Sequence, residues 1–167
     1  LTDPTDTGLK SAEWYYGPQT RLLAAYEVNL KNQESTFQSI HFGLNYQNIE
    51  ESRNNRNFGS ANLNHRIENV GVLGANLDLQ KVLIKHNIRF GADMQLNSLA
   101  STANRENIED GITEPLDTRY PDGDNTMHNF AAYFSHTWSI NDQLTLNDGF
   151  RVGYSMLHST LVDTALL

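Results

Sequence analysis

Two long runs near the end of the chain, residues 127–139 and 144–156, alternate between apolar and polar side chains. Because successive side chains of a β-strand point to opposite faces, each run predicts a strand with one apolar and one polar face. The four residues between the runs include Asn141 and Asp142, which can adopt the positive φ that a tight hairpin turn requires. Both predicted strands exceed the roughly five or six residues of an ordinary soluble strand. This length is typical of strands that cross a bilayer.

Four earlier segments show the same alternation, and none between them has a convincing helical period. These strands are predicted at about residues 21–30, 37–47, 68–79 and 86–98. The connections are short at 31–36, 80–85 and 140–143, but long and polar at 48–67 and 101–126. Short turns at one end and long loops at the other are typical of an up-and-down barrel in the outer membrane. The sequence therefore predicts an all-β fold, an antiparallel up-and-down meander of about six strands of a larger transmembrane β-barrel, with residues 1–20 as the end of a further outer loop.

Composition excludes several classes of protein. Apolar residues make up 38% of the 167 residues, and no run of 18 apolar residues could form a transmembrane helix. The chain has no cysteine, so disulfides and thiolate chemistry are not available to it. A net charge of −8 argues against a nucleic-acid partner, which would require a basic surface.

The parity of the predicted strands assigns their side chains to two faces. His136 and Asp148 share the apolar parity near the short-turn end, where the headgroup boundary tolerates charge. We expect the apolar face to meet outer-membrane lipid through Ile40, Phe42, Leu77, Phe90, Phe134, Phe150 and Val152.

A soluble β-sandwich offers an alternative, because its strands also have one apolar and one polar face. Such a module would bury the apolar faces in a dry core and could bind a ligand or glycan through Trp14, Tyr15 and Tyr16. The strand lengths, the alternating loop lengths and a polar face rich in Gly, Asn, Gln, Asp and Arg favour the membrane wall. Behaviour without detergent would separate the two, because a sandwich stays soluble whereas an incomplete barrel precipitates.

Several short segments, in this order along the chain, resemble the barrel of TonB-dependent outer-membrane receptors. They are Glu13-Trp14-Tyr15-Tyr16-Gly17-Pro18-Gln19, the segment from Tyr46 to Arg53, the segment from Arg66 to Val70, the segment from His86 to Asp93, the segment from Thr118 to Gly123, and the segment from Leu144 to Arg151. Each segment is moderately specific, and their order and spacing extend the resemblance over nearly the whole chain.

The resemblance implies a barrel of about twenty-two strands around an N-terminal plug. Such receptors take up a scarce ligand (an iron chelate, haem, cobalamin or a glycan), with energy delivered by TonB. The chain shows no plug, no TonB-contacting segment and no closing strand with a terminal aromatic residue, so residues 1–167 are expected to form one partial barrel domain. Its expected partners are outer-membrane lipid, the plug and the remaining barrel strands, with TonB acting only through the absent N-terminal part. The side chains expected to face the lumen and the plug, or to pair within the wall, are Glu27, Asp78, Arg89, Asp93, Asn147 and Arg151.

Motifs for catalysis, metal ligation and cofactor binding are not found. The sequence contains no GxSxG, HExxH or glycine-rich phosphate loop, and the six histidines lack metal-ligand spacing. We therefore expect neither an enzyme nor a cofactor. The candidate ligand contacts lie in the predicted outer loops, where solvated loop tips are the alternative reading, and they are Arg53, Arg56, Arg66, Arg119 and Tyr120.

Overall fold

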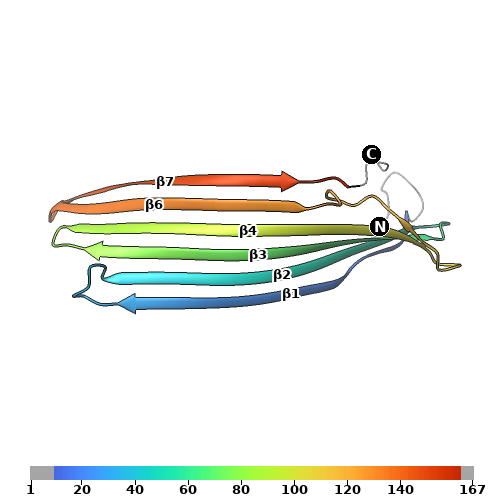
Figure 1. The fold of residues 1–167 in the computed structure, drawn as a ribbon, viewed down its shortest axis with the longest axis horizontal. Helices are drawn as coiled ribbons and strands as arrows, with labels where there is room; N and C mark the ends of the chain where they lie inside the picture. Colours follow the sequence, from blue (N-terminus) through green and yellow to red (C-terminus); the bar gives the residue numbers. More distant parts are fainter. Residues whose placement is uncertain (1–9, 163–167) are drawn as a thin grey trace.

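A computed structural model describes residues 10–162, which form one antiparallel sheet (Figure 1). Six long strands and one short strand make up this sheet. They are β1 (Ser11–Lys31), β2 (Ser39–Asn57), β3 (Asn62–Val82), β4 (His86–Asn107), β5 (Thr113–Pro115), β6 (Asn125–Asn141) and β7 (Leu144–Ser159). The long strands are ordered β1-β2-β3-β4-β6-β7, and β5 pairs with the far end of β4. The predicted antiparallel meander is thereby confirmed.

Both edges of the sheet are open among the described residues. β1 pairs with β2 alone and β7 pairs with β6 alone, and every residue of β7 is exposed. Because a free edge offers unpaired N–H and C=O groups to any other strand, neither β1 nor β7 can be a stable boundary in water.

The register carries the two-faced pattern across the whole sheet. Leu79, Phe90, Phe134 and Phe150 lie in one row, since directly opposed residues of neighbouring strands share a face. The rings of Phe134 lie 5.4 Å from Phe90 and 5.8 Å from Phe150, measured between centroids. All seven residues expected to meet lipid share this face, and all six expected to face the lumen share the opposite one.

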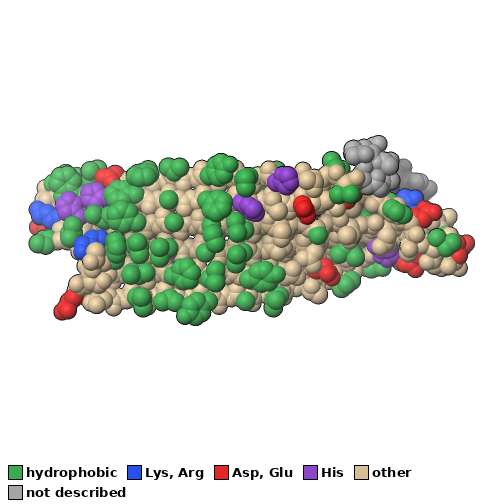
Figure 2. Space-filling view, in the orientation of Figure 1, with side chains coloured by type: hydrophobic (Ala, Val, Ile, Leu, Met, Phe, Trp, Pro, Cys, Tyr) green, Lys and Arg blue, Asp and Glu red, His purple; other side chains and the backbone are tan. Residues whose placement is uncertain are grey.

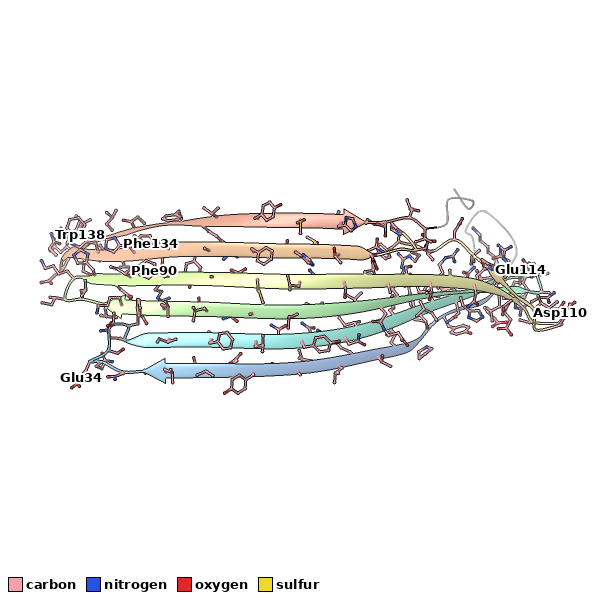
Figure 3. The ribbon with its side chains drawn as sticks, viewed as in Figure 1. Glu34, Phe90, Asp110, Glu114, Phe134 and Trp138 are labelled. Carbon is pink, nitrogen blue, oxygen red and sulfur yellow. The ribbon has the colours of Figure 1, made fainter. Side chains whose placement is uncertain are left out.

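The apolar face forms a band that stops before the strands end. Along β7 it extends from Leu146, opposite Trp138, to Met156, in the same row as Tyr46. About ten residue steps of about 3.4 Å, tilted by about 40°, give a height of about 26 Å, close to the apolar band of about 25 Å in outer-membrane barrels. In Figure 2 the hydrophobic side chains gather over this part of the face, and acidic side chains lie mainly toward the loop end. Figure 3 shows Phe90, Phe134 and Trp138 together near the short turns, with Asp110 and Glu114 at the opposite end.

The described residues have almost no apolar core. Leu63 and Val72 are their only buried apolar side chains, whereas Phe150 and Val152 are 65% and 66% exposed. The β-sandwich alternative required a second sheet over the apolar face, and residues 10–162 contain a single sheet. That alternative therefore does not hold for the described part of the chain.

The first long predicted loop, 48–67, is mostly strand, and the second, 101–126, is strand only in part, which corrects the predicted loop lengths. The predicted loop 48–67 contains only a four-residue turn, 58–61, between β2 and β3, with Gly59 at a φ of 74°. β4 continues to Asn107 within the second predicted loop, and β1 already begins at Ser11, although residues 1–9 lie outside the described part. Beyond the apolar band both faces can carry polar side chains, so the alternation that reveals a strand is lost while backbone pairing continues.

The last hairpin turn also differs from its prediction. No residue other than glycine has a positive φ among residues 10–162, so Asn141 and Asp142 do not adopt one. Instead, the Oδ1 atom of Asn141 accepts a hydrogen bond of 2.9 Å from the backbone N–H of Gln143. A register shift between Ser139 and Asn141 accompanies this turn. The side-chain hydrogen bond and the bulge together reverse the chain without a left-handed residue.

Candidate ligand-binding site

Paired polar side chains cross the middle of the polar face. Arg151 on β7 donates from one nitrogen to both carboxylate oxygens of Asp93 on β4, at 3.0 and 2.7 Å. Tyr133 on β6 donates to Asp78 on β3 across the backbone of Gly91. A Cβ at residue 91 would lie 1.8 Å from the tyrosine ring, so only glycine leaves room for this contact. At this height, part of the charged and polar side chains of the polar face are therefore paired with one another.

The remaining residues expected to face the lumen lie in the same face. Asn147 accepts a hydrogen bond of 2.8 Å from Thr137, and Arg89 lines a small cavity together with Asp78 and Tyr133. Glu27 lies in the same cross-strand row as Asp93. The register places them on one face, and what they face in a complete protein stays a prediction.

Arginines from two strands and one loop meet at the loop end of this polar face. Arg53 on β2 and Arg66 on β3 are directly opposed, and Arg119 comes from the segment between β5 and β6. These three side chains, with Trp14, line a cavity of about 230 Å³ that Asn54 and Asn55 complete. The continuation of β2 and β3 past the apolar band is what brings Arg53 and Arg66 side by side.

An aromatic pair forms one wall of this cavity. The rings of Trp14 and Tyr16 on β1 meet edge to face with centroids 5.0 Å apart, and the guanidinium of Arg53 lies 5.2 Å from the centroid of Tyr16. Trp14 remains 52% exposed, so a large part of its ring is free for another contact. The sequence predicted Trp14 as a ligand contact only in the β-sandwich alternative.

The three arginines differ in how their charge is balanced. Arg53 pairs with Glu51 at 2.7 Å, and this side-chain hydrogen bond raises the pKa of Arg53 above its usual value. Arg66 donates to the backbone carbonyl of Asp117 at 3.3 Å and to Asn55 at 3.4 Å, both neutral acceptors. Among residues 10–162, no carboxylate forms a salt bridge with Arg66 or Arg119. Two carboxylates, those of Glu51 and Glu68, act on Arg53, so three guanidinium groups stand against two carboxylates and the cavity keeps an excess of positive charge.

Two of the expected ligand contacts lie elsewhere. Arg56 points to the opposite face of β2, where it bonds Glu13 at 2.7 Å and the carbonyl of Ser60 at 3.0 Å. Tyr120 stacks under Arg119, whose guanidinium lies 6.0 Å from the ring centroid. Both Arg119 and Tyr120 line a second cavity of about 610 Å³, formed largely by residues 115–122. The structure thus groups Arg53, Arg66 and Arg119, puts Tyr120 in the second cavity beside Arg119, and places Arg56 on the opposite face.

A buried carboxylate lies two residues from Arg66 on the same face, closer to the membrane band. Glu68 is 6% exposed and Ser101, its cross-strand neighbour, is 4% exposed. Neither carboxylate oxygen of Glu68 nor the hydroxyl of Ser101 has a hydrogen-bond partner in the described part of the chain. Burying such polar groups without hydrogen-bond partners is costly, so we expect other parts of a complete protein to supply those partners here.

The histidines do not gather into a metal site. At the short-turn end of the apolar face, His86 Nδ1 lies 2.9 Å from His136 Nε2, and His136 Nδ1 lies 3.3 Å from Asp148. His65 lies between Asn54 and Glu106. No group of three or more metal-ligating side chains occurs in residues 10–162. No helix within that range is long and apolar enough to cross a membrane.

Comparisons with known proteins agree with this architecture. A sequence-family model described as TonB dependent receptor-like, β-barrel, matches residues 2–164. The chain therefore belongs to the TonB-dependent receptor β-barrel family, which is a class of outer-membrane receptors and transporters and not a class of enzymes.

Among solved structures, the chain is similar to one titled "Copper transporter OprC", with a TM-score of 0.72 and 14% sequence identity. The match covers 87% of this chain and 24% of that protein, so the chain spans about a quarter of the length of this structural relative. At this identity the likeness concerns the fold alone. A search of curated protein sequences found no match.

Proposed function

We propose that the chain is a section of barrel wall in an outer-membrane receptor that imports a scarce ligand by TonB-coupled transport. The observation that carries this proposal is the sheet itself. One of its faces bears an uncovered apolar band of about 26 Å, and the opposite face is polar at the same height. Family membership agrees with it.

In the proposed receptor the two faces have separate tasks. The apolar face contacts outer-membrane lipid through Ile40, Phe42, Leu77, Phe90, Phe134, Phe150 and Val152. The polar face lines the lumen and meets a plug domain through Glu27, Asp78, Arg89, Asp93, Asn147 and Arg151. The open edges of β1 and β7 pair with the remaining barrel strands, because a closed barrel leaves no edge. TonB acts on a part of the receptor that residues 1–167 do not include.

The loop end of the polar face is the proposed place of first contact with the ligand. Arg53, Arg66, Arg119 and Tyr120 lie there, beyond the membrane band and on the side that faces the lumen. Arg56 lies on the outer side and pairs with Glu13, so it has a supporting role in the wall. The candidate ligands are an iron chelate, haem, cobalamin or a glycan.

Deletion of the gene that encodes the complete receptor tests this function. Growth of the deletion strain is compared with that of the parent strain when an iron chelate, haem, cobalamin or a glycan is the limiting nutrient. We expect a defect for one of these nutrients, restored by the intact gene and matched by inactivation of TonB in the parent strain. The receptor should also be recovered with outer-membrane fractions.

Two results would contradict the proposal. One is recovery of the receptor outside the outer membrane. The other is unchanged growth on all four nutrients under limitation, with the parent strain shown to depend on TonB for each.

A further inference from the structure

We infer that the cavity between Trp14, Arg53, Arg66 and Arg119 binds an anionic group that is attached to a planar conjugated part of the ligand. This inference rests on the proposed function, because it assigns a ligand class to the loop end of that receptor. Three separate features of the cavity support it: its charge, its size and its aromatic wall.

The charge of the cavity selects an anion. Arg53 shares its charge with Glu51, but Arg66 has only neutral acceptors and Arg119 lies over an aromatic ring. A guanidinium presents several N–H donors in one plane, a geometry that matches the oxygens of a carboxylate, a phosphate or a phenolate. Two guanidinium groups without a carboxylate partner therefore favour a ligand group of at least one negative charge.

The size of the cavity limits what enters it. A volume of about 230 Å³ is below the range of roughly 300–1,000 Å³ typical of pockets for whole ligands. It fits one anionic group with a ring, and Arg119 connects it to the larger cavity of about 610 Å³, where Tyr120 lies. We assign the rest of the ligand to that second cavity.

The aromatic wall adds a preference for a planar group. Trp14 is held edge to face by Tyr16, which fixes the orientation of the indole ring while half of its surface stays exposed. A conjugated ring stacks on such a surface at small entropic cost. A saturated ring of the same charge lacks that contact.

A membrane phosphate is a second possible source of negative charge, and the geometry argues against it. Arg53 and Arg66 share the face opposite to the apolar band, so lipid on the outer face does not reach them. Arg56, at nearly the same height on the outer face, already has Glu13 as its partner. The inference therefore concerns a ligand that enters from the lumen side.

Three small probes separate charge from planarity in the purified, detergent-solubilised complete receptor. Phthalate is a planar dianion, cyclohexane-1,2-dicarboxylate is a dianion without a planar ring, and phthalamide is planar and neutral. Calorimetric titration should show phthalate binding several-fold more tightly than the saturated dianion. Phthalamide should show no measurable binding, because its charge is missing.

Variants assign the binding to the cavity. Arg66→Gln and Arg119→Gln should each weaken phthalate binding by roughly ten- to hundredfold, as expected for the loss of hydrogen bonds between charged groups. Trp14→Ala should reduce phthalate affinity to that of the saturated dianion. Arg56→Gln is the matched control, since it removes the same charge from the same strand on the opposite face, and it should leave binding unchanged.

The inference is overturned if phthalamide binds as well as phthalate, or if Arg56→Gln weakens phthalate binding as much as Arg66→Gln does. Unchanged migration of unheated samples on gels shows that each variant has folded, and Arg66→Lys, which keeps the charge, should retain part of the affinity. The binding measurement needs neither TonB nor uptake. Loss of the anion preference with growth defects intact therefore removes this inference alone, whereas absent growth defects remove the proposed function.

Discussion

The short-turn half and the loop half of the same strands follow different rules. Within the apolar band, β4 alternates strictly, with Phe90, Ala92 and Met94 on one face and Arg89, Gly91 and Asp93 on the other. Beyond the band, β2 runs through Asn54 and Asn55 with polar residues on both faces, yet its pairing with β1 and β3 continues. Alternation of side-chain polarity thus depends on what the two faces contact, whereas the end of a strand depends on where backbone hydrogen bonding to its neighbours stops.

The loop half also has more buried residues than the band half. In the loop half Ser52, Asn54, Leu63, Glu68 and Ser101 are buried by neighbouring chain, in part by the segment that follows β5. Among the described residues, the band half buries only two glycines, Gly43 and Gly74, with Val72 at its border with the loop half. Side chains of the loop half are buried by other residues of this chain, whereas side chains of the band half are left for other molecules to cover.

The largest expected difference concerns hydrogen exchange in the loop half. Amides of residues 49–55 lie in a strand paired on both sides, so we expect them to exchange at least about a thousandfold more slowly than those of the turn 58–61. The measurement is amide exchange in the complete receptor, read by mass spectrometry. Equally fast exchange in both segments would mean that residues 49–55 form a loop, as the sequence predicted, and that the two halves of the strands do not differ in this way.

An arginine introduced on the outer face should destabilise the protein more in the apolar band than in the loop half. Ala132→Arg puts a guanidinium in the middle of the apolar band and should lower the free energy of unfolding by about 2–4 kcal/mol. Ala100→Arg, on the same face of β4 but beyond the band, should cost less than about 1 kcal/mol. Denaturant unfolding in lipid vesicles measures both.

A second control for this pair compares the two faces at one height. Ala131 is the neighbour of Ala132 and lies on the polar face beside Asp93, so Ala131→Arg should also cost less than about 1 kcal/mol. If Ala132→Arg costs no more than these two controls, the apolar face does not meet hydrocarbon.

Replacement of a glycine on the polar face should have the next largest effect on the free energy of unfolding. Gly91→Ala forces the Tyr133 ring away and breaks its hydrogen bond with Asp78, with an expected cost of about 1–3 kcal/mol. At Gly153, two rows away on the same face, a Cβ would find no atom nearer than 3.7 Å. Gly153→Ala should therefore be nearly neutral by the same unfolding assay, and equal losses for both variants would mean that Tyr133 does not pack on residue 91.

Ion pairs of the two halves give the smallest effect. Arg151 and Asp93 are 55% and 40% exposed, so a double-mutant cycle should give a coupling of about 0.2–1 kcal/mol. Arg56 and Glu13 are less exposed, at 21% and 35%, and their coupling should lie at the upper end of that range. A coupling well above that range for Arg151 and Asp93 would show that a domain inside the barrel covers the pair.

The band half could be predicted from the sequence because lipid and lumen impose opposite polarities on its faces. The fourth strand was predicted at 86–98, and β4 begins at His86 as expected but continues to Asn107. Its continuation carries Asn and Arg on both faces, so nothing in the pattern distinguishes it from a loop. The turn at Asn141 was placed correctly, but its conformation depends on a side-chain hydrogen bond that composition does not reveal.

The site could be predicted only in part for the same reason. Arg53 and Arg56 were grouped as neighbours in a loop, whereas a strand places residues three positions apart on opposite faces. Recognition of the hairpin would have paired Arg53 with Arg66 by register. Trp14 was proposed as a ligand contact only for the β-sandwich, because its position beside the arginines depends on the start of β1 and on the register shift between Tyr16 and Gln19.

The central claim is that one face of this sheet meets lipid and the other meets the lumen. Spin labels at residues 89 and 90 of the complete receptor in lipid vesicles test it most directly, through Arg89→Cys and Phe90→Cys in a background without other cysteines. We predict that the label at residue 90 collides mainly with lipid-soluble oxygen, and the label at residue 89 mainly with a water-soluble nickel chelate. Equal accessibility of both labels to either reagent would contradict the account.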